Sequence, residues 1–184
     1  IASEYRKKNV PVIMGGFHAT LIPEEVIEYA ESIVVGEAEN IWGELIEDFK
    51  TGNLQKFYVQ EGRADLSKTS PDRSIFQRKN YLQIGLVEAA RGCRFTCDFC
   101  AIQTFFKNTQ AARPIESIIR EIKEIQKDLI FFVDDNLVSN PVWTKEFLKA
   151  LVPQKIRWVG QASINVAFDK EILHLLKESG CFGL

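Results

Sequence analysis

Three cysteines stand within eight residues of one another in the segment RGCRFTCDFC, residues 91–100, at Cys93, Cys97 and Cys100. This Cys-x3-Cys-x2-Cys spacing allows three thiolates to converge on one inorganic centre, and thiolate ligands select iron–sulfur clusters or zinc. A structural zinc site needs four ligands, and neither a second cysteine pair nor a nearby His follows the segment. Three thiolates on a four-iron cluster leave one iron open to another ligand. The spacing therefore favours a catalytic iron–sulfur cluster.

The cysteine segment follows the first of three predicted strands, each of which ends in polar residues. We predict these strands at 81–89, 129–133 and 156–159, and the second and third lead into Asp134-Asp135-Asn136 and into Gln161 and Ser163. Helices are predicted between the strands and after the last one, with Asn140 and Asp169 as N-caps. Parallel strands end at one edge of a sheet, where α/β barrels place their sites. The polar residues are therefore predicted to share an edge with the cysteines.

The first third of the chain shows the same alternation of strands and helices. Apolar runs at 11–14 and 33–35 predict buried strands that end at glycines, and helices are predicted from Pro23 and over 39–50. Residues 56–80 contain Gly, Ser, Pro and Asp with few periodic apolar positions, which is typical of a linker. We therefore predict two α/β domains, over 1–55 and 81–184, joined by that linker.

Composition excludes several classes of protein. The chain has 184 residues, 23 Lys and Arg against 25 Asp and Glu, and no basic patch of the kind that binds nucleic acid. No apolar run approaches the roughly 20 residues that span a bilayer. Four cysteines are too few for a disulfide scaffold in a chain of this length. The chain starts at Ile1 without an initiator Met and stops at Leu184, so we expect it to be a piece of a longer protein.

The cysteine segment after the first barrel strand resembles the signature of the radical S-adenosylmethionine (radical SAM) enzymes. In that family three cysteines hold a 4Fe-4S cluster, and its open iron chelates the amino and carboxylate groups of SAM. One electron then cleaves SAM to methionine and a 5′-deoxyadenosyl radical. The resemblance implies that Phe99, the aromatic residue before the last cysteine, lies against the adenine. It also implies SAM contacts for four polar residues at the strand ends: Asp134, Asp135, Gln161 and Ser163.

The Asp134-Asp135 pair departs from the family pattern, which often has Gly-Gly-Glu at the end of this strand. Acidic groups there would suit the ammonium of SAM or its positively charged sulfonium. The alternative is an ordinary helix cap in a solvated turn, with no ligand contact. The same alternative applies to Gln161 and Ser163.

The upstream half resembles the end of the cobalamin-binding domain that precedes the barrel in cobalamin-dependent radical SAM enzymes. The motifs are MGGFHAT at 14–20, PEE at 23–25 and VGEAE at 35–39. Glycines there would let the backbone approach the nucleotide tail of the cofactor. The predicted cobalamin residues are Gly15, Gly16, His18, Thr20, Gly36 and Glu37. The implied fold is α/β: the C-terminal part of a Rossmann-like, doubly wound cobalamin domain, followed by the first half of a partial (βα)6 TIM-like barrel.

Three residues outside these motifs have chemistry of their own. His18 is interpreted as a contact to the cofactor tail, with a cobalt ligand and a structural residue as alternatives. His174, on the last predicted helix, is interpreted as structural. Cys181 follows Gly180 outside the cluster motif and is interpreted as a small, partly apolar residue.

The function implied by these resemblances is a cytoplasmic radical SAM enzyme that methylates or otherwise modifies an unactivated carbon of a small molecule. Its cofactors would be a 4Fe-4S cluster, SAM and cobalamin, and its reductant a protein such as flavodoxin or ferredoxin. An enzyme like the anaerobic magnesium-protoporphyrin monomethyl ester oxidative cyclase is an alternative. A methylthiotransferase is more distant, because residues 1–80 contain no Cys. The non-enzyme alternatives are an iron–sulfur electron carrier, which needs a fourth ligand, and a zinc-binding module.

Overall fold

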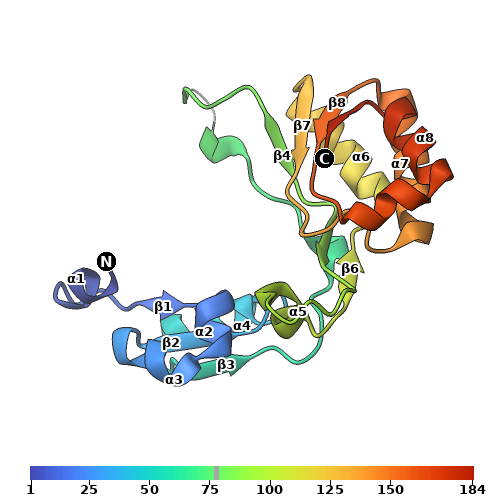
Figure 1. The fold of residues 1–184 in the computed structure, drawn as a ribbon. Coiled ribbons are helices and arrows are strands. Elements are labelled where there is room, and N and C mark those ends of the chain that lie inside the picture. The colour runs from blue at the N-terminus through green and yellow to red at the C-terminus, as the bar shows by residue number, and fades with distance from the viewer. Residues whose placement is uncertain (77–78) are drawn as a thin grey trace. The chain divides into compact units, whose positions relative to one another are not determined.

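The chain forms two compact units, Ile1–Thr69 and Ser70–Leu184, each built around a parallel sheet (Figure 1). The structure is a computed structural model that describes residues 1–76 and 79–184. Residues 77 and 78, inside the predicted linker, lie outside the described residues. The predicted α/β class with parallel strands is confirmed by the pairing in both sheets.

The sheet of the first unit has the order β1-β2-β3, with all strands parallel. Its strands are β1 (Ile13–Met14), β2 (Ser32–Val35) and β3 (Phe57–Val59). The chain outside the strands forms α1 (Ala2–Arg6), α2 (Phe17–Leu21), α3 (Pro23–Val26), η1 (Ile27–Tyr29) and α4 (Trp42–Thr51). Parallel strands require a crossover connection, and here α2, α3 and η1 connect β1 to β2 while α4 connects β2 to β3.

Both faces of this sheet are buried. Ile33 of β2 packs with Ala19 and Val26 on one face, while its neighbour Val34 packs with Leu45 and Tyr58 on the other. Successive side chains of a strand point to opposite faces, so a strand covered on both sides reads as an unbroken apolar run. That is why Ile33-Val34-Val35 was recognisable from the sequence.

The predicted linker is wrong in one respect, because part of it belongs to the first sheet. Residues 57–59 form β3, and the 3-10 helix η2 (Leu66–Lys68) follows before the second unit begins. A strand of three residues is too short to show a period in the sequence. Its only buried residue is Tyr58, so no apolar run marked it.

The sheet of the second unit has the order β4-β7-β8-β9, and all its strands are parallel. The strands are β4 (Gly85–Val87), β7 (Leu129–Phe132), β8 (Arg157–Val159) and β9 (Cys181–Gly183). Helices α6 (Ile115–Ile125), α7 (Pro141–Leu151) and α8 (Lys170–Glu178) connect them in chain order. The fourth strand was not predicted, because only four residues follow Gly180 in the sequence.

The predicted strand at 81–89 is shorter than expected and is followed by a second, separate strand. Residues 85–87 form β4, whereas β5 (Ala90–Gly92) pairs antiparallel with β6 (Gln110–Ala112). The segment between β5 and β6 carries the three cysteines and α5 (Ala101–Phe106). The cysteine segment and α5 therefore lie between the two strands of a ladder that the sequence did not reveal. Short 3-10 helices η3 (Ser74–Phe76), η4 (Val152–Gln154) and η5 (Ile164–Phe168) complete the unit.

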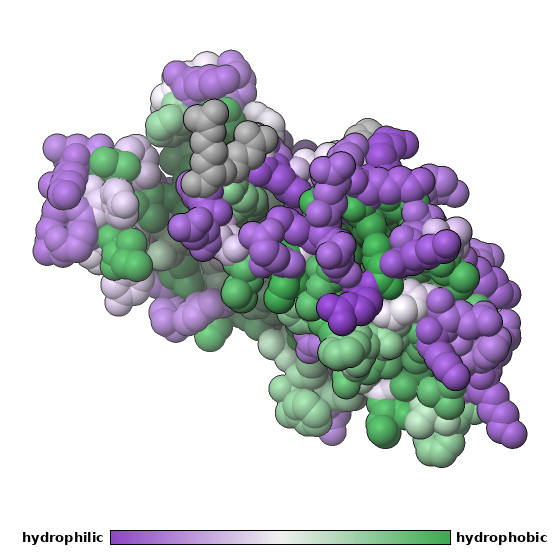
Figure 2. Space-filling model, turned by 90° about the horizontal axis from the view of Figure 1, so that it is seen from above, coloured by the Kyte–Doolittle hydropathy of each residue, from purple (hydrophilic) through white to green (hydrophobic). Residues whose placement is uncertain are grey.

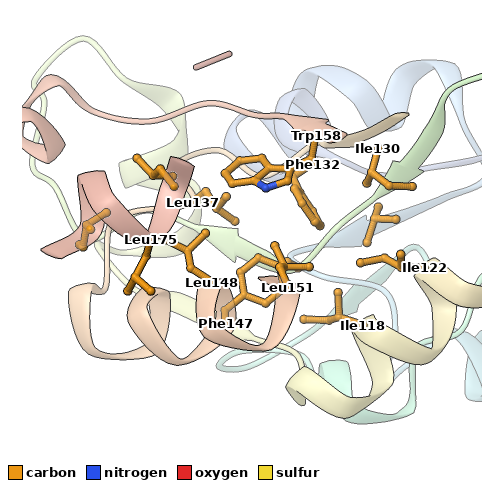
Figure 3. Packing of buried hydrophobic residues seen from close by; sticks show 14 residues of the cluster. Ile118, Ile122, Ile130, Phe132, Leu137, Phe147, Leu148, Leu151, Trp158 and Leu175 are labelled. Carbon is orange, nitrogen blue, oxygen red and sulfur yellow. The ribbon is translucent and has the colours of Figure 1, made fainter. Parts of the chain in front are cut away.

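The core of the second unit lies between its sheet and helices α6, α7 and α8 (Figure 3). Phe132 packs edge-on against Phe147 and Trp158, with ring centroids 5.3 Å and 5.4 Å away. Each such side chain contributes about 1.5–3 kcal/mol by leaving water. The helix predicted between the first two strands is confirmed as α6, and its Ile118 and Ile122 are buried in this core. The core therefore fixes the strands whose ends carry the polar residues.

The two predicted helix caps differ in outcome. Asp169 caps α8, since its carboxylate accepts hydrogen bonds from the N–H groups of Glu171 and Ile172, both at 3.0 Å. Asn140 is the N-cap residue of α7, as predicted, but its side chain makes no capping hydrogen bond. The backbone carbonyl of Asn140 instead accepts the hydroxyl of Thr144 at 2.8 Å.

Large hydrophobic side chains remain at the surface of both units. Figure 2 shows hydrophobic surface between hydrophilic side chains on the face that it presents. Single exposed hydrophobic residues are normal, but Phe99 is 93% exposed on the cysteine segment itself. Among the described residues, no helix combines the length and the apolar character that a membrane span requires.

Candidate functional site: the cysteine segment and the strand ends

The cysteine segment follows Gly92, the last residue of β5, whose backbone conformation is typical of glycine. Gly92 is buried and has a φ of 90°, in the region that side chains disfavour. From there the chain reaches Cys93, which is partly buried, the exposed Cys97 and the partly buried Cys100. The N–H of Cys100 donates to the carbonyl of Cys97 at 3.0 Å, which makes a tight turn between the last two thiols.

All three thiols are free, and their type and spacing suit an iron–sulfur cluster. Within residues 1–76 and 79–184, no three His, Cys, Asp or Glu side chains are gathered closely enough to hold a metal ion. The donor set fits the cluster in its chemistry, and Cys93 lies beside the strand ends through its contact with Asn136. The exposed part of the segment, residues 94–99, contains Cys97 and two aromatic side chains, Phe95 and Phe99.

Asp134, at the end of β7, holds the chain just before the cysteine segment. Its side chain is buried, and its two carboxylate oxygens accept the N–H groups of Ala89 and Ala90. The predicted contact of Asp134 to SAM does not match this geometry, because both oxygens face the protein backbone and the residue is 1% exposed. The alternative of a helix cap is also wrong. Asp134 instead fixes the strand end from which the cysteines extend.

Burial decides the protonation of this carboxyl. Removal from water raises the pKa of Asp134 to about 7, and the two backbone hydrogen bonds lower it by less than burial raises it. A raised pKa in the folded state means that the folded chain binds the proton more tightly than the unfolded chain. The stability that this group contributes is therefore complete below about pH 4 and is lost as the pH rises toward 7.

Replacing Asp134 with Asn should destabilise the second unit and change how its stability depends on pH. The Asn side chain keeps the volume, but its NH2 group faces a backbone N–H that then lacks an acceptor, which costs about 1–3 kcal/mol. This penalty should shrink between pH 5 and pH 8, because only the parent loses stability over that range. Chemical unfolding followed by tryptophan fluorescence, with hydrogen exchange at the amides of Ala89 and Ala90, measures both effects.

Asp128→Asn is the matched control for this substitution, because Asp128 is an exposed acid in the same unit. It should leave the stability and its pH dependence unchanged. A penalty for Asp134→Asn that grows from pH 5 to pH 8 would mean that the carboxyl is ionised throughout, and would overturn the assignment of a raised pKa.

The next two residues also contact the cysteine segment. Asp135 accepts the N–H of Gly92 at 2.8 Å through its carboxylate. Asn136 is buried, and its side-chain NH2 group lies 3.4 Å from the sulfur of Cys93 and 3.1 Å from the hydroxyl oxygen of Ser163. Asp134, Asp135 and Asn136 therefore contact the chain from Ala89 to Cys93 one after another.

Sequence reasoning missed Asn136. The only signal was its position next to the two acids at a strand end, and an asparagine there is equally typical of a turn. Ser163 is brought to the same place, whereas the side chain of Gln161 is exposed and its carbonyl accepts the N–H of Leu137 at 3.0 Å. The structure therefore brings Cys93, Asp135 and Ser163 together around Asn136.

Arg113 fixes the same strand end from the other side. It is buried, its Nη1 donates to the carbonyl of Glu88 at 2.8 Å, and its own N–H donates to the carbonyl of Ala89 at 3.0 Å. An ion pair of 2.6 Å to Glu121 of α6 holds the guanidinium in place. Since a buried charge without a partner is costly, this pair ties α6 to the base of the cysteine segment.

The predicted cobalamin residues lie in the first unit, after β1 and β2. Gly16 has a φ of 88° and Gly36 a φ of 91°. The hydroxyl oxygen of Thr20 accepts the N–H of Gly36 at 2.9 Å, so the two glycine turns are held together. A side chain added at Gly16 would meet no atom within 4 Å, whereas at Gly36 it would approach the carbonyl of Gln60 at 3.1 Å.

A cavity of about 530 Å³ lies beside the end of β1 in this unit. Among its lining residues are Met14, Gly15, His18 and Tyr29. The side chain of His18 is exposed and lies 3.4 Å from the carboxylate of Glu25. Glu37 is placed differently, because it is buried and its carboxylate accepts Arg63 and the N–H of Ala64 at 2.7 Å and 3.0 Å. The cobalamin contact of Glu37 stays a prediction.

The two remaining predicted structural residues lie away from these sites. His174 is on the exposed face of α8 and pairs with Glu178 at 3.2 Å. Cys181 is in β9, where its sulfur lies 3.7 Å from the carbonyl of Gly183 and burial raises the pKa of its thiol. A thiol that stays protonated is a poor metal ligand. This agrees with the interpretation of Cys181 as a residue outside the cluster motif.

Comparison with protein families finds a match to the model described as the radical SAM superfamily over residues 87–184. Among curated proteins, the chain is 27% identical over 181 residues to the bacteriochlorophyllide d C-12(1)-methyltransferase of Chlorobaculum tepidum, covering 92% of this chain and 40% of that protein. It is 26% identical over 204 residues to the anaerobic magnesium-protoporphyrin IX monomethyl ester cyclase of Cereibacter sphaeroides, covering 91% and 33%. The chain thus spans about two fifths or less of the length of these two relatives.

Comparison with solved structures finds the same fold in TsrM from Kitasatospora setae, at a TM-score of 0.74 and 18% identity. The match covers 98% of this chain and 42% of that one. TsrM is described as a radical S-adenosylmethionine methyltransferase, with cobalamin and a [4Fe-4S] cluster bound in that structure. Both units of the chain therefore have counterparts within one known protein.

Proposed function

Since this chain belongs to the radical SAM superfamily, we propose that Cys93, Cys97 and Cys100 hold a 4Fe-4S cluster that binds SAM. The observation that carries the proposal is the set of three free thiols on one segment, beside the carboxyl ends of a parallel sheet, in the part of the chain that the family model matches. When bound, the cluster supplies the electron that cleaves SAM to methionine and a 5′-deoxyadenosyl radical. The residues of this chain hold the cluster, orient SAM and exclude water.

The exposed Phe99 supports a SAM site on the cysteine segment. A phenylalanine that is 93% exposed makes little contribution to stability, and it offers a flat apolar surface to the adenine. We also propose that Asp135, Gln161 and Ser163 contact SAM, since each follows the end of a barrel strand. Asp134 is left out of this set, because its carboxylate is used by the backbone of Ala89 and Ala90.

We propose that the first unit is the C-terminal part of a cobalamin-binding domain, and the second the first part of the radical SAM barrel. Two observations support cobalamin: the pair of glycine turns joined by Thr20, and the cavity lined by Gly15 and His18. In this proposal Gly15, Gly16, Thr20 and Gly36 let the cofactor tail approach the backbone, and His18 contacts it. TsrM, whose fold covers both units, was solved with cobalamin bound.

The reaction that we propose is methylation of an unactivated carbon in a small molecule. The relatives whose names state a reaction include methyltransferases that act on bacteriochlorophyllide d and a hopanoid C-2 methylase of Rhodopseudomonas palustris. The anaerobic cyclases among them favour a second candidate, an oxidative cyclisation. Either reaction needs a one-electron reductant, for which flavodoxin or ferredoxin is suitable, and we propose the reducing cytoplasm as its location.

The test uses the full-length protein, reconstituted without oxygen and supplied with SAM, cobalamin and dithionite. We expect methionine and 5′-deoxyadenosine from radical cleavage, and S-adenosylhomocysteine in addition if SAM donates its methyl group. Cleavage without S-adenosylhomocysteine would favour the oxidative cyclase. A cluster that forms but never cleaves SAM would favour an electron carrier and would contradict the proposal.

A further inference from the structure

Among the described residues outside the cysteine segment, only Asn136 makes a side-chain hydrogen bond to Cys93, Cys97 or Cys100. It follows β7, is 5% exposed, and its NH2 group lies 3.4 Å from the sulfur of Cys93. A contact to sulfur is longer than one to oxygen, so this distance is consistent with an N–H donor directed at the thiol. None of the residues predicted from the sequence has this contact.

The orientation of the amide group is fixed by its other partners. The side-chain oxygen of Asn136 accepts the backbone N–H groups of Ser163 and Val138, at 3.2 Å and 3.3 Å. A flipped amide would direct its NH2 group at those two donors, which cannot accept a hydrogen bond. The NH2 group must therefore face Cys93 and Ser163, so both of its protons have partners.

A hydrogen bond donated to a ligating sulfur changes the reduction potential of a cluster. The three thiolates and the cluster are more negative after one electron is added, so an N–H group directed at a sulfur stabilises the reduced state more than the oxidised state. Hydrogen bonds to the sulfurs are among the factors that set the potentials of iron–sulfur clusters. The donor here is neutral and buried, so its effect does not depend on a titration.

We propose that Asn136 is a positioning residue that raises the reduction potential of the cluster through its hydrogen bond to the sulfur of Cys93. The inference rests on the proposed function, because it requires the cluster to be held by Cys93. Ser163 acts through Asn136, since its backbone N–H donates to the side-chain oxygen of Asn136 and its hydroxyl oxygen accepts the NH2 group. The electron itself comes from an external one-electron donor, and Asn136 changes only how readily the cluster accepts it.

The experiment is a redox titration of the reconstituted full-length protein, followed by electron paramagnetic resonance. Asn136→Leu is close in shape and removes the donor, while Asn136→Asp keeps an acceptor for Ser163 and Val138 but replaces the NH2 group with oxygen. Both variants should shift the reduction equilibrium about tenfold toward the oxidised cluster, which is a fall of about 59 mV for one electron. Asn136→Asp should give the larger fall, because it places an acceptor beside the sulfur.

Asn140→Leu is the matched control, because Asn140 lies in the same loop and its side chain makes no capping hydrogen bond. It should keep the potential of the parent. An unchanged potential in either Asn136 variant with a full iron content overturns the inference. So does loss of the cluster from both variants, since Asn136 would then act in assembly. A parent protein that binds no cluster would contradict the proposed function itself and is distinguished by its iron content.

Discussion

Replacement of Cys93, Cys97 or Cys100 with Ala is expected to abolish iron–sulfur cluster assembly in the full-length protein. The cysteine segment offers three thiolates and no fourth, so each of them is needed to hold a cluster whose remaining iron stays open. The parent should contain about four irons per chain after anaerobic reconstitution, and each variant close to none. Iron and sulfide analysis, together with the visible absorbance of the cluster, measures the effect.

Cys181→Ala is the matched control, since Cys181 is the fourth cysteine of the chain and also belongs to the second unit. Burial raises the pKa of its thiol, and its sulfur contacts the carbonyl of Gly183. The iron content of this variant should equal that of the parent. A cluster that survives loss of Cys97 but disappears with Cys181 would show that the ligands have been assigned to the wrong segment.

The second large effect is expected in the first unit, where Gly16→Ala should reduce cobalamin retention at least about tenfold. Gly16 has a φ of 88°, and an added side chain would extend into space that no atom of the chain occupies within 4 Å. That space is where we place the cofactor tail, so the methyl group would keep the tail from the backbone. The cobalamin bound to the purified full-length protein is measured by its absorbance.

Gly52→Ala provides the control for backbone strain. Gly52 follows α4 with a φ of 74°, and an added side chain there also meets no atom within 4 Å. Melting temperatures of both variants report the strain, which is about 1–3 kcal/mol for a side chain in such a conformation. Cobalamin retained by Gly16→Ala removes Gly16 from the site. Equal loss of cobalamin in the two variants would assign the loss to strain.

Much of the fold could be predicted because its signals are local. The isoleucines of α6 repeat with the helical period, and Ile118 and Ile122 are buried. Asp169 caps α8 through its own neighbours in the chain. The apolar run of β2 is continuous because both faces of its sheet are covered. Three short strands were not predicted: β3, β5 and β6 have three residues each, no apolar run marks them, and they are defined by the strands with which they pair.

The sequence alone determined the chemistry of this protein: three thiols at a spacing that suits a cluster, and polar residues at the ends of strands. Ligand type and spacing are properties of the chain, and they do not depend on what packs around them. Only the tertiary structure decided which polar residues face the cysteines. Asp134 and Asp135 look alike in sequence, yet one is buried against the backbone of Ala89 and Ala90 and the other holds Gly92.

Asn136 shows the same limit most directly. Its contact with Cys93 joins residues 43 positions apart, and its amide is oriented by Ser163, 27 positions further on. No local pattern encodes such a contact, because it arises only when parallel strands bring their carboxyl ends to one edge of the sheet. The residues that could bind a cluster were therefore visible in the sequence, whereas the residues that position and tune it depend on how the strands meet.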